Sequence, residues 1–255
     1  MKSVPRTVNF FKHKKVDELL QQLSKALFPA HCYYCGRGQS SSLTIQFDIC
    51  EDCWAELPWL AHACRSCAEP LIEPGFCGRC LHDQELIQHC LVPLRYETPV
   101  NTWIQAFKYH GELSYGRCLT EILLRTIQST EIPLPDIIVP VPMHKSRLRQ
   151  RGYNQAAVIA NDLGKWLNRP VLLNTLQRKI NSKSQSTLSK QQRRQNLTAA
   201  FSIDMSSFKQ GGEIPQQIAL VDDVITTGST IKACASVLKQ AGVQQVTVWA
   251  LARTP

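Results

Sequence analysis

The sequence contains no uninterrupted apolar run that approaches the roughly 18 residues of a membrane-spanning helix. Its N-terminus, residues 1–15, is basic but lacks the apolar stretch of a secretory signal peptide. Both absences argue against a membrane-embedded or secreted protein, and we therefore expect a cytoplasmic one. Because the reducing cytosol does not keep cysteines as disulfides, the 11 cysteines of the chain need another explanation.

Acidic residues are scarce in one long segment. Between Lys145 and Arg194 the chain has 12 lysines and arginines but a single acid, Asp162. Residues 1–90 are nearly balanced, with 9 basic and 10 acidic residues, whereas residues 91–255 have 20 and 10. The net charge of +9 thus belongs to the back part, where it favours partners that carry phosphate, such as nucleotides or nucleic acid. A solvated basic face that keeps the protein soluble is the alternative.

Eight of the cysteines form four pairs, each with a two-residue gap. The pairs are Cys32 and Cys35, Cys50 and Cys53, Cys64 and Cys67, and Cys77 and Cys80. Two pairs complete a tetrahedral four-sulfur site, which zinc favours, with iron–sulfur ligation or a redox dithiol as alternatives. Pairing in chain order and an interleaved cross-brace both remain open. The segment lacks an apolar core of its own, so we expect structural zinc to supply its folding energy.

The apolar pattern predicts three parts. Residues 1–30 contain an amphipathic helix at 16–28, residues 31–90 hold the double zinc ribbon, and residues 91–255 form an α/β domain. In the last part, strand-like segments alternate with helical ones. The strands are expected at 91–95, 137–142, 199–203, 217–222 and 245–252, and the helices at 99–109, 112–128, 154–167 and 229–241. Alternation of this kind predicts a parallel sheet with helices on both faces, while the polar segment 178–196 is expected to be a mobile loop leading into a short helix.

The most informative segment follows the strand expected at 217–222. The strand delivers two carboxylates to the carboxyl edge of the sheet, and a loop rich in hydroxyl groups then leads into a helix. The residues concerned are Asp222, Asp223, Thr226, Thr227, Gly228, Ser229 and Thr230. Free amides at the helix start favour a phosphate, and the carboxylates suit a vicinal diol or a magnesium ion, so the segment describes a ribose 5-phosphate site. A Walker B strand or an aspartate pair like that of receiver domains is the alternative, but the chain has no Gly-x₄-Gly-Lys-Ser/Thr loop to accompany a Walker B strand.

This loop resembles the phosphoribosyl pyrophosphate signature of type I phosphoribosyltransferases, and the chain from about Cys32 onward resembles the ComF family of bacterial competence proteins, of the ComFC and GntX type. Three further elements carry the resemblance. They are Lys108-Tyr109-His110-Gly111; Pro140-Val141-Pro142 with Arg147 and Arg151-Gly152-Tyr153-Asn154-Gln155; and Arg178, Ser182, Gln185, Leu188, Arg193, Asn196 and Phe201. Ser182 stands where the family commonly has threonine.

The resemblance implies a double zinc ribbon followed by a type I phosphoribosyltransferase-like parallel-sheet domain. It also implies that phosphoribosyl pyrophosphate binds with magnesium, beneath a flexible hood formed by residues 178–190. The pyrophosphate would lie near the two most basic loops, whose candidate contacts are Arg147, Arg151, Lys179 and Lys183. Plain surface charge is the alternative for each of these side chains.

Three functional hypotheses follow. The resemblance implies a protein that binds phosphoribosyl pyrophosphate and single-stranded DNA and acts in DNA uptake during natural transformation. The second hypothesis is an active phosphoribosyltransferase whose acceptor is unknown and whose catalytic residues are unknown. Thr226 argues against hypoxanthine or guanine as that acceptor, because the enzymes for 6-oxopurines have an aspartate there. The third is a zinc-ribbon interaction module for a helicase or motor partner.

Overall fold

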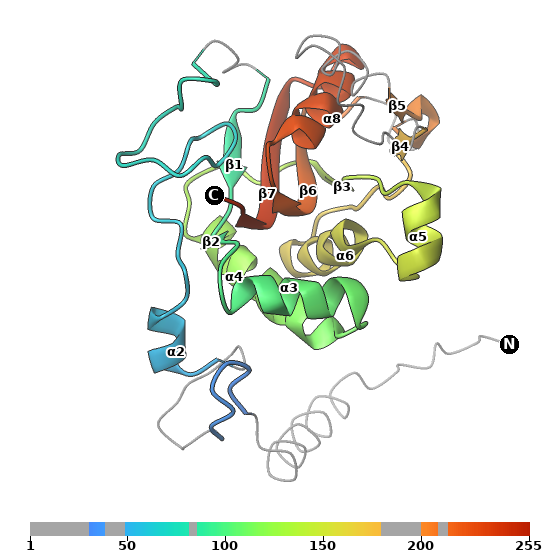
Figure 1. Ribbon diagram of the computed structural model, residues 1–255. Helices are drawn as coiled ribbons and strands as arrows, with labels where there is room; N and C mark the ends of the chain where they lie inside the picture. Colours follow the sequence, from blue (N-terminus) through green and yellow to red (C-terminus); the bar gives the residue numbers. More distant parts are fainter. Residues whose placement is uncertain (1–30, 39–48, 82–85, 180–199, 209–213) are drawn as a thin grey trace, which may run out of the picture. The chain divides into compact units, whose positions relative to one another are not determined.

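The computed structural model describes residues 31–38, 49–81, 86–179, 200–208 and 214–255 (Figure 1). The chain divides into two compact units, Met1–Glu56 and Leu57–Pro255. The helix expected at 16–28 and the segment 180–196 of the expected mobile loop lie outside the described residues. In the described part of the chain, no helix is long and apolar enough to cross a membrane.

The described part of the first unit is a cysteine turn followed by a short helix, α2 (Glu51–Ala55). The amide of Gly36 donates to the carbonyl of Cys32 over 2.9 Å, and the amide of Cys32 donates to the carbonyl of Arg37 over 2.9 Å. Gly36 has φ +71°, a left-handed conformation that glycine adopts without steric cost. Cys50 is the residue that precedes α2, so the turn and the helix start each present one pair of cysteines.

A parallel sheet organises the second unit. Its strands are β1 (His89–Leu91), β2 (Leu94–Arg95), β3 (Ile137–Pro140), β6 (Gln217–Ile225) and β7 (Gln245–Arg253). The order is β1-β7-β6-β3, with β2 also beside β7, and every pair is parallel. Buried apolar residues such as Ile218 and Val248 run along the two central strands, as expected for a sheet covered on both faces. The predicted parallel α/β domain is thereby confirmed.

Helices cover both faces of this sheet, as the alternating pattern predicted. Three of them lie on one face: α3 (Val100–Tyr109), α4 (Leu113–Gln128) and α6 (Gln155–Leu167). The helix α8 (Ser229–Gln240) lies on the other face (Figure 1). A separate antiparallel pair joins β4 (Leu176–Arg178) to β5 (Phe201–Ile203), so the strand expected at 199–203 is present but does not join the parallel sheet. A short 3-10 helix, η1 (Met205–Ser207), follows β5.

Two expectations near the candidate site were wrong. The strand expected to end at residue 222 continues to Ile225, because β7 pairs with it as far as Arg253. The basic segment expected as a loop is a helix, α5 (Lys145–Arg151), which begins where His144 Nδ1 accepts from the amide of Ser146. Gly152 ends this helix with φ +82°. Because none of its residues is buried, this helix has no apolar stripe, and the periodicity of apolar residues did not predict it.

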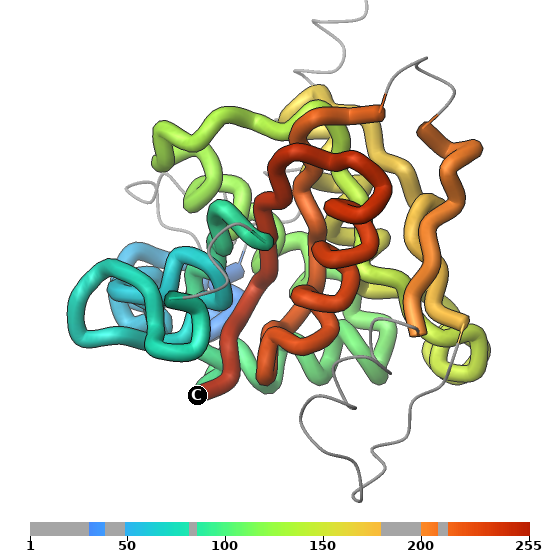
Figure 2. The backbone as a smooth tube through the Cα atoms, turned by 90° about the horizontal axis from the view of Figure 1, so that it is seen from above, coloured from blue at the N-terminus to red at the C-terminus, as the bar shows by residue number. Residues whose placement is uncertain are grey.

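The second set of cysteine pairs folds as part of the α/β unit. Leu60 and Ala68 belong to the same buried core as Ile225 and Ile231. Backbone hydrogen bonds also join the segment to the strand region, from the amide of Leu60 to the carbonyl of Pro93 and from the amide of Arg95 to that of Pro58, each 2.8 Å. Figure 2 shows residues 57–81, in teal, beside the red end of β7. This cysteine segment is therefore anchored to the sheet region by apolar contacts and by backbone hydrogen bonds.

Candidate functional site

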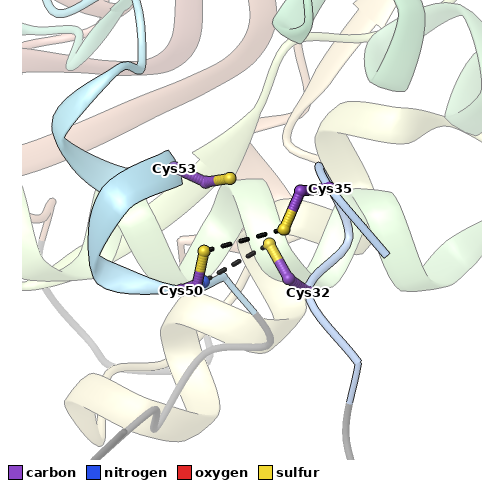
Figure 3. A group of neighbouring side chains, drawn as sticks. All are labelled: Cys32, Cys35, Cys50 and Cys53. Carbon is purple, nitrogen blue, oxygen red and sulfur yellow. Dashed lines mark hydrogen bonds between the residues drawn. The ribbon is translucent and has the colours of Figure 1, made fainter. Parts of the chain in front are cut away.

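The first cysteine cluster gathers four sulfur atoms around one centre (Figure 3). The four sulfur atoms of Cys32, Cys35, Cys50 and Cys53 all lie within 4.8 Å of one another, and Cys35 Sγ is 3.8 Å from Cys50 Sγ. Arg37 donates to Cys35 Sγ over 3.3 Å and also contacts the carboxylate of Asp52 at 3.0 Å. The hydrogen bond from Arg37 lowers the pKa of Cys35 to about 6, which favours the thiolate that binds metal.

A second cluster has the same composition. Its members are Cys64, Cys67, Cys77 and Cys80, all of them buried, with their sulfur atoms also within 4.8 Å of one another. The pairs are therefore combined in chain order, and the cross-brace is excluded. Two closed four-sulfur sets fit structural zinc, since a catalytic zinc keeps a coordination position open. Metal would cross-link the two turns of each cluster.

The expected loop joins β6 to α8 through Gly228. This glycine is buried and has φ +73°, and it precedes the first residue of α8 without offering a side chain as a cap. A residue with a Cβ would be strained there whatever the space around it. The hydroxyl groups of Thr227 and Ser229 are exposed and 2.8 Å apart. Amide groups at the start of a helix together with exposed hydroxyls form an arrangement that favours an anion.

The two carboxylates lie within β6, next to this loop. Burial, and then the charge of Asp223, raise the pKa of Asp222 to about 7. Lys108 and Arg178 act in the opposite direction on the same carboxyl group. Lys108 Nζ lies 3.0 Å from Asp223 Oδ2, and both side chains are largely buried, at 16% and 13% exposure. Basic side chains from α3 and β4 thus partly balance a carboxylate pair in β6.

Of the four basic residues predicted to contact pyrophosphate, the structure describes Arg147, Arg151 and Lys179. Burial and the charge of Arg147 lower the pKa of Arg178, so these two arginines lie near each other. Arg151, in α5, donates to the hydroxyl of Tyr109 over 3.0 Å, and its guanidinium lies 4.9 Å from the centre of that ring. Lys179 is exposed immediately after β4, and Lys183 lies outside the described residues.

A small pocket of about 30 Å³ opens at this end of β6. Its lining residues are Asp222, Val224, Ile225, Thr226, Gly228, Thr230 and Ile231. A carboxylate and the start of α8 therefore face the same space. A larger open groove of about 680 Å³ lies between β5 and α8, but its lining, which includes Phe201, Met205 and Val237, contains no charged residue. The groove is thus poorly suited to a phosphate.

Known proteins are similar to this chain over both cysteine clusters and over most of its length. The double zinc ribbon domain family matches residues 23–81, which contain both cysteine clusters. Competence protein F of Haemophilus influenzae is 34% identical over 212 residues, covering 81% of this chain and 85% of that protein. The chain belongs to the ComF family. The DNA utilization protein YhgH of Salmonella typhi (31% identity, 89% and 98% coverage) and competence protein ComFC of Bacillus subtilis (23%, 76% and 79%) are also similar.

Solved structures similar to this ComF chain include two phosphoribosyltransferases. The purine phosphoribosyltransferase of Pyrococcus horikoshii is 16% identical, with a TM-score of 0.32 and coverage of 54% of this chain and 71% of that one. The orotate phosphoribosyltransferase of Aeropyrum pernix is 17% identical, with a TM-score of 0.32 and coverage of 57% and 75%. The parallel α/β assignment rests on the strand order given above.

Three residues of this ComF site were not among the predicted ligand contacts. Lys108 was noted in a family motif without a role, Arg178 was assigned only to the hood expected at residues 178–190, and Arg253 was not noted. Arg253 is 2% exposed, and its guanidinium forms an ion pair with Glu69. A signal was available for Arg253, because a lone arginine ends the otherwise apolar strand expected at 245–252.

Proposed function

We propose that this ComF protein binds phosphoribosyl pyrophosphate together with magnesium at the end of β6, and that it binds single-stranded DNA as part of DNA uptake. The observation that carries the proposal is the placing of Asp222 and Gly228 on one pocket, so that a carboxylate and a helix start face the same ligand. The helix start suits a 5-phosphate, and the carboxylates suit the ribose diol or the metal ion. Relatives named for competence and DNA utilization support the DNA role.

The pocket by itself is too small for a ribose 5-phosphate, so the rest of the ligand would extend over the open end of the sheet. Arg178 lies near Asp222, Arg147 lies near Arg178, and both guanidinium groups suit the several negative charges of pyrophosphate. Magnesium would be held through Asp222 or Asp223 and would supply charge for a leaving pyrophosphate. Transfer of the phosphoribosyl group would also require an acceptor molecule.

Titration calorimetry with phosphoribosyl pyrophosphate and magnesium tests the first half. The wild type should bind, and the double variant Asp222→Asn with Asp223→Asn should not. Asp136→Asn is the matched control, because its carboxylate accepts from the amides of Gln216 and Gln217 at the opposite end of β6. Equal binding by the wild type and the double variant would remove the site.

Fluorescence anisotropy with a labelled oligothymidylate tests the second half. Binding should weaken steeply as the salt concentration rises, because phosphate contacts release counterions.

A screen of acceptor molecules that follows pyrophosphate release tests for an active transferase. A helicase or motor partner of the zinc ribbon stays a prediction, and capture of such a partner by the full-length chain would support it.

A further inference from the structure

Arg253 connects the second cysteine cluster to the loop between β6 and α8. Among the described residues it is the most deeply buried charged residue, at 2% exposure. Its Nε donates to the carbonyl oxygen of Cys67 over 3.3 Å, and its Nη1 donates to the carbonyl oxygen of Ile225 over 3.5 Å. Its Nη2 forms the ion pair with Glu69. One guanidinium thus joins the cysteine segment to the last residue of β6, immediately before the loop.

A second contact reaches the middle of the same loop. A Cβ built on Gly228 would lie 3.8 Å from the Cβ of Cys67, in van der Waals contact, so the loop passes close to the side chain of this metal-ligand candidate. Ala68, which follows Cys67, is fully buried in the core that also contains Ile225 and Ile231. The residue before the loop is therefore linked to the Cys67 segment through Arg253, Gly228 lies close to Cys67, and Ile231 after the loop belongs to the same core as Ala68.

We propose that the second cysteine cluster, with its metal bound, fixes the conformation of the loop at residues 226–230 through Cys67 and Arg253. Metal at this cluster would hold Cys67 in place, and the loop would take its position from Cys67 and Arg253. Arg253 is a positioning residue, since it contacts only protein groups. The consequence for ligand affinity rests on the proposed function, in which this loop holds a 5-phosphate, whereas the consequence for loop conformation does not.

Two arginines form ion pairs with the same carboxylate, and replacing each of them gives a matched pair of variants. Glu69 binds both Arg253 and Arg79, but Arg79 is 63% exposed and binds the carboxylate at 2.7 Å. Arg79 hydrogen-bonds the side chain of Cys77, whereas Arg253 donates to the carbonyl groups of Cys67 and Ile225. In Arg253→Gln the carboxylate keeps Arg79, and all the cysteines remain. Hydrogen exchange of the full-length, zinc-loaded protein should be faster at amides 226–231 in Arg253→Gln, and unchanged there in Arg79→Gln. Affinity for phosphoribosyl pyrophosphate with magnesium should fall about tenfold in Arg253→Gln only, the scale of one hydrogen bond to a charged group.

The metal itself is tested by removing one ligand from each cluster. Cys77→Ser should lower zinc content and speed exchange of the loop amides, whereas Cys35→Ser should lower zinc content and leave those amides unchanged. Equal loop exchange in Cys77→Ser and Cys35→Ser, or unchanged exchange in Arg253→Gln, would overturn the inference. If Cys77→Ser does not fold, Arg253→Gln still decides it. A wild type that binds no phosphoribosyl pyrophosphate would end the proposed function while leaving the loop-exchange result to stand or fall separately.

Discussion

The ammonium group of Lys108, near the end of α3, lies 3.0 Å from a carboxylate oxygen of Asp223 in β6. The two residues are more than 100 positions apart in the chain, yet both side chains are largely buried at the contact. The ion pair brings a positive charge next to Asp222 as well, since Lys108 lowers the pKa of that carboxyl group. Two neighbouring carboxylates in a buried strand are thereby kept compatible with folding before any ligand arrives.

Replacing Lys108 should therefore destabilise the folded protein. In Lys108→Met the carboxylates lose their closest cation, and we expect the free energy of unfolding at neutral pH to fall by about 2–3 kcal/mol, because a poorly solvated charge is left unpaired. Urea unfolding measures the change. Arg117→Gln is the control, since Arg117 is 70% exposed and pairs with Glu121 one turn along the same helix, so its removal should cost less than about 0.5 kcal/mol. Similar losses in the two variants would contradict a special role for Lys108.

The raised pKa of Asp222 predicts a pH dependence of stability with a definite sign. Its pKa is about 7 in the folded protein against 3.8 for an unperturbed aspartate, so between these values the folded state binds the proton more tightly. Asp222 therefore favours folding at pH values below about 4, and this contribution is lost as the pH rises to about 7.

Asp222→Asn isolates this effect because asparagine can still accept from the amide of Asp223, as Asp222 does over 2.9 Å, but does not ionise. Relative to the wild type, the variant should gain stability at pH 8 compared with pH 5, by on the order of 1–3 kcal/mol. Denaturant unfolding of both proteins at both pH values measures the difference. A variant whose advantage is the same at pH 5 and pH 8 would show that Asp222 titrates normally.

Much of this architecture follows from local patterns in the sequence. The helices α3, α4, α6 and α8 were predicted because their apolar residues repeat with the helical period, and the strands β6 and β7 because they are short, largely apolar runs. The four cysteine pairs were predicted as metal ligands from spacing alone. The combination of the pairs in chain order needed the structure, because the same spacing allows a cross-brace.

What the sequence could not supply are the contacts between distant segments. Whether Lys108 meets Asp223, or Arg253 meets Glu69, depends on how α3 and the cysteine segment pack on the sheet, and no local pattern encodes that packing. The helix α5 was missed for a related reason. It buries none of its residues and so has no apolar stripe, and its stability comes from a cap and from propensity rather than from burial.

Metal content provides a direct test of the cysteine clusters. The purified full-length protein should contain about two zinc ions per chain under reducing conditions, one for each cluster. Cys35→Ser and Cys77→Ser should each leave about one ion, and removal of zinc by a chelator should destabilise both segments, since metal supplies their folding energy. Atomic absorption measures the ions. Zinc content near zero, or two ions retained in both variants, would contradict the assignment.

Removing the charges of the basic helix α5 should change the salt dependence of DNA binding by a predictable amount. Arg147 is exposed on this helix, and Arg151 contacts the exposed ring of Tyr109, so phosphate and a base could meet side by side there. For single strands, each phosphate contact contributes about 0.7 to the slope of log affinity against log salt. The double variant Arg147→Gln with Arg151→Gln should therefore reduce that slope by about 1.4, as measured with oligothymidylate over a range of salt concentrations. Arg125→Gln removes an equally exposed charge from α4, outside this helix, and should change the slope far less. If the α5 double variant and Arg125→Gln behave alike, the basic charge of the domain attracts DNA only diffusely and α5 is not its binding surface.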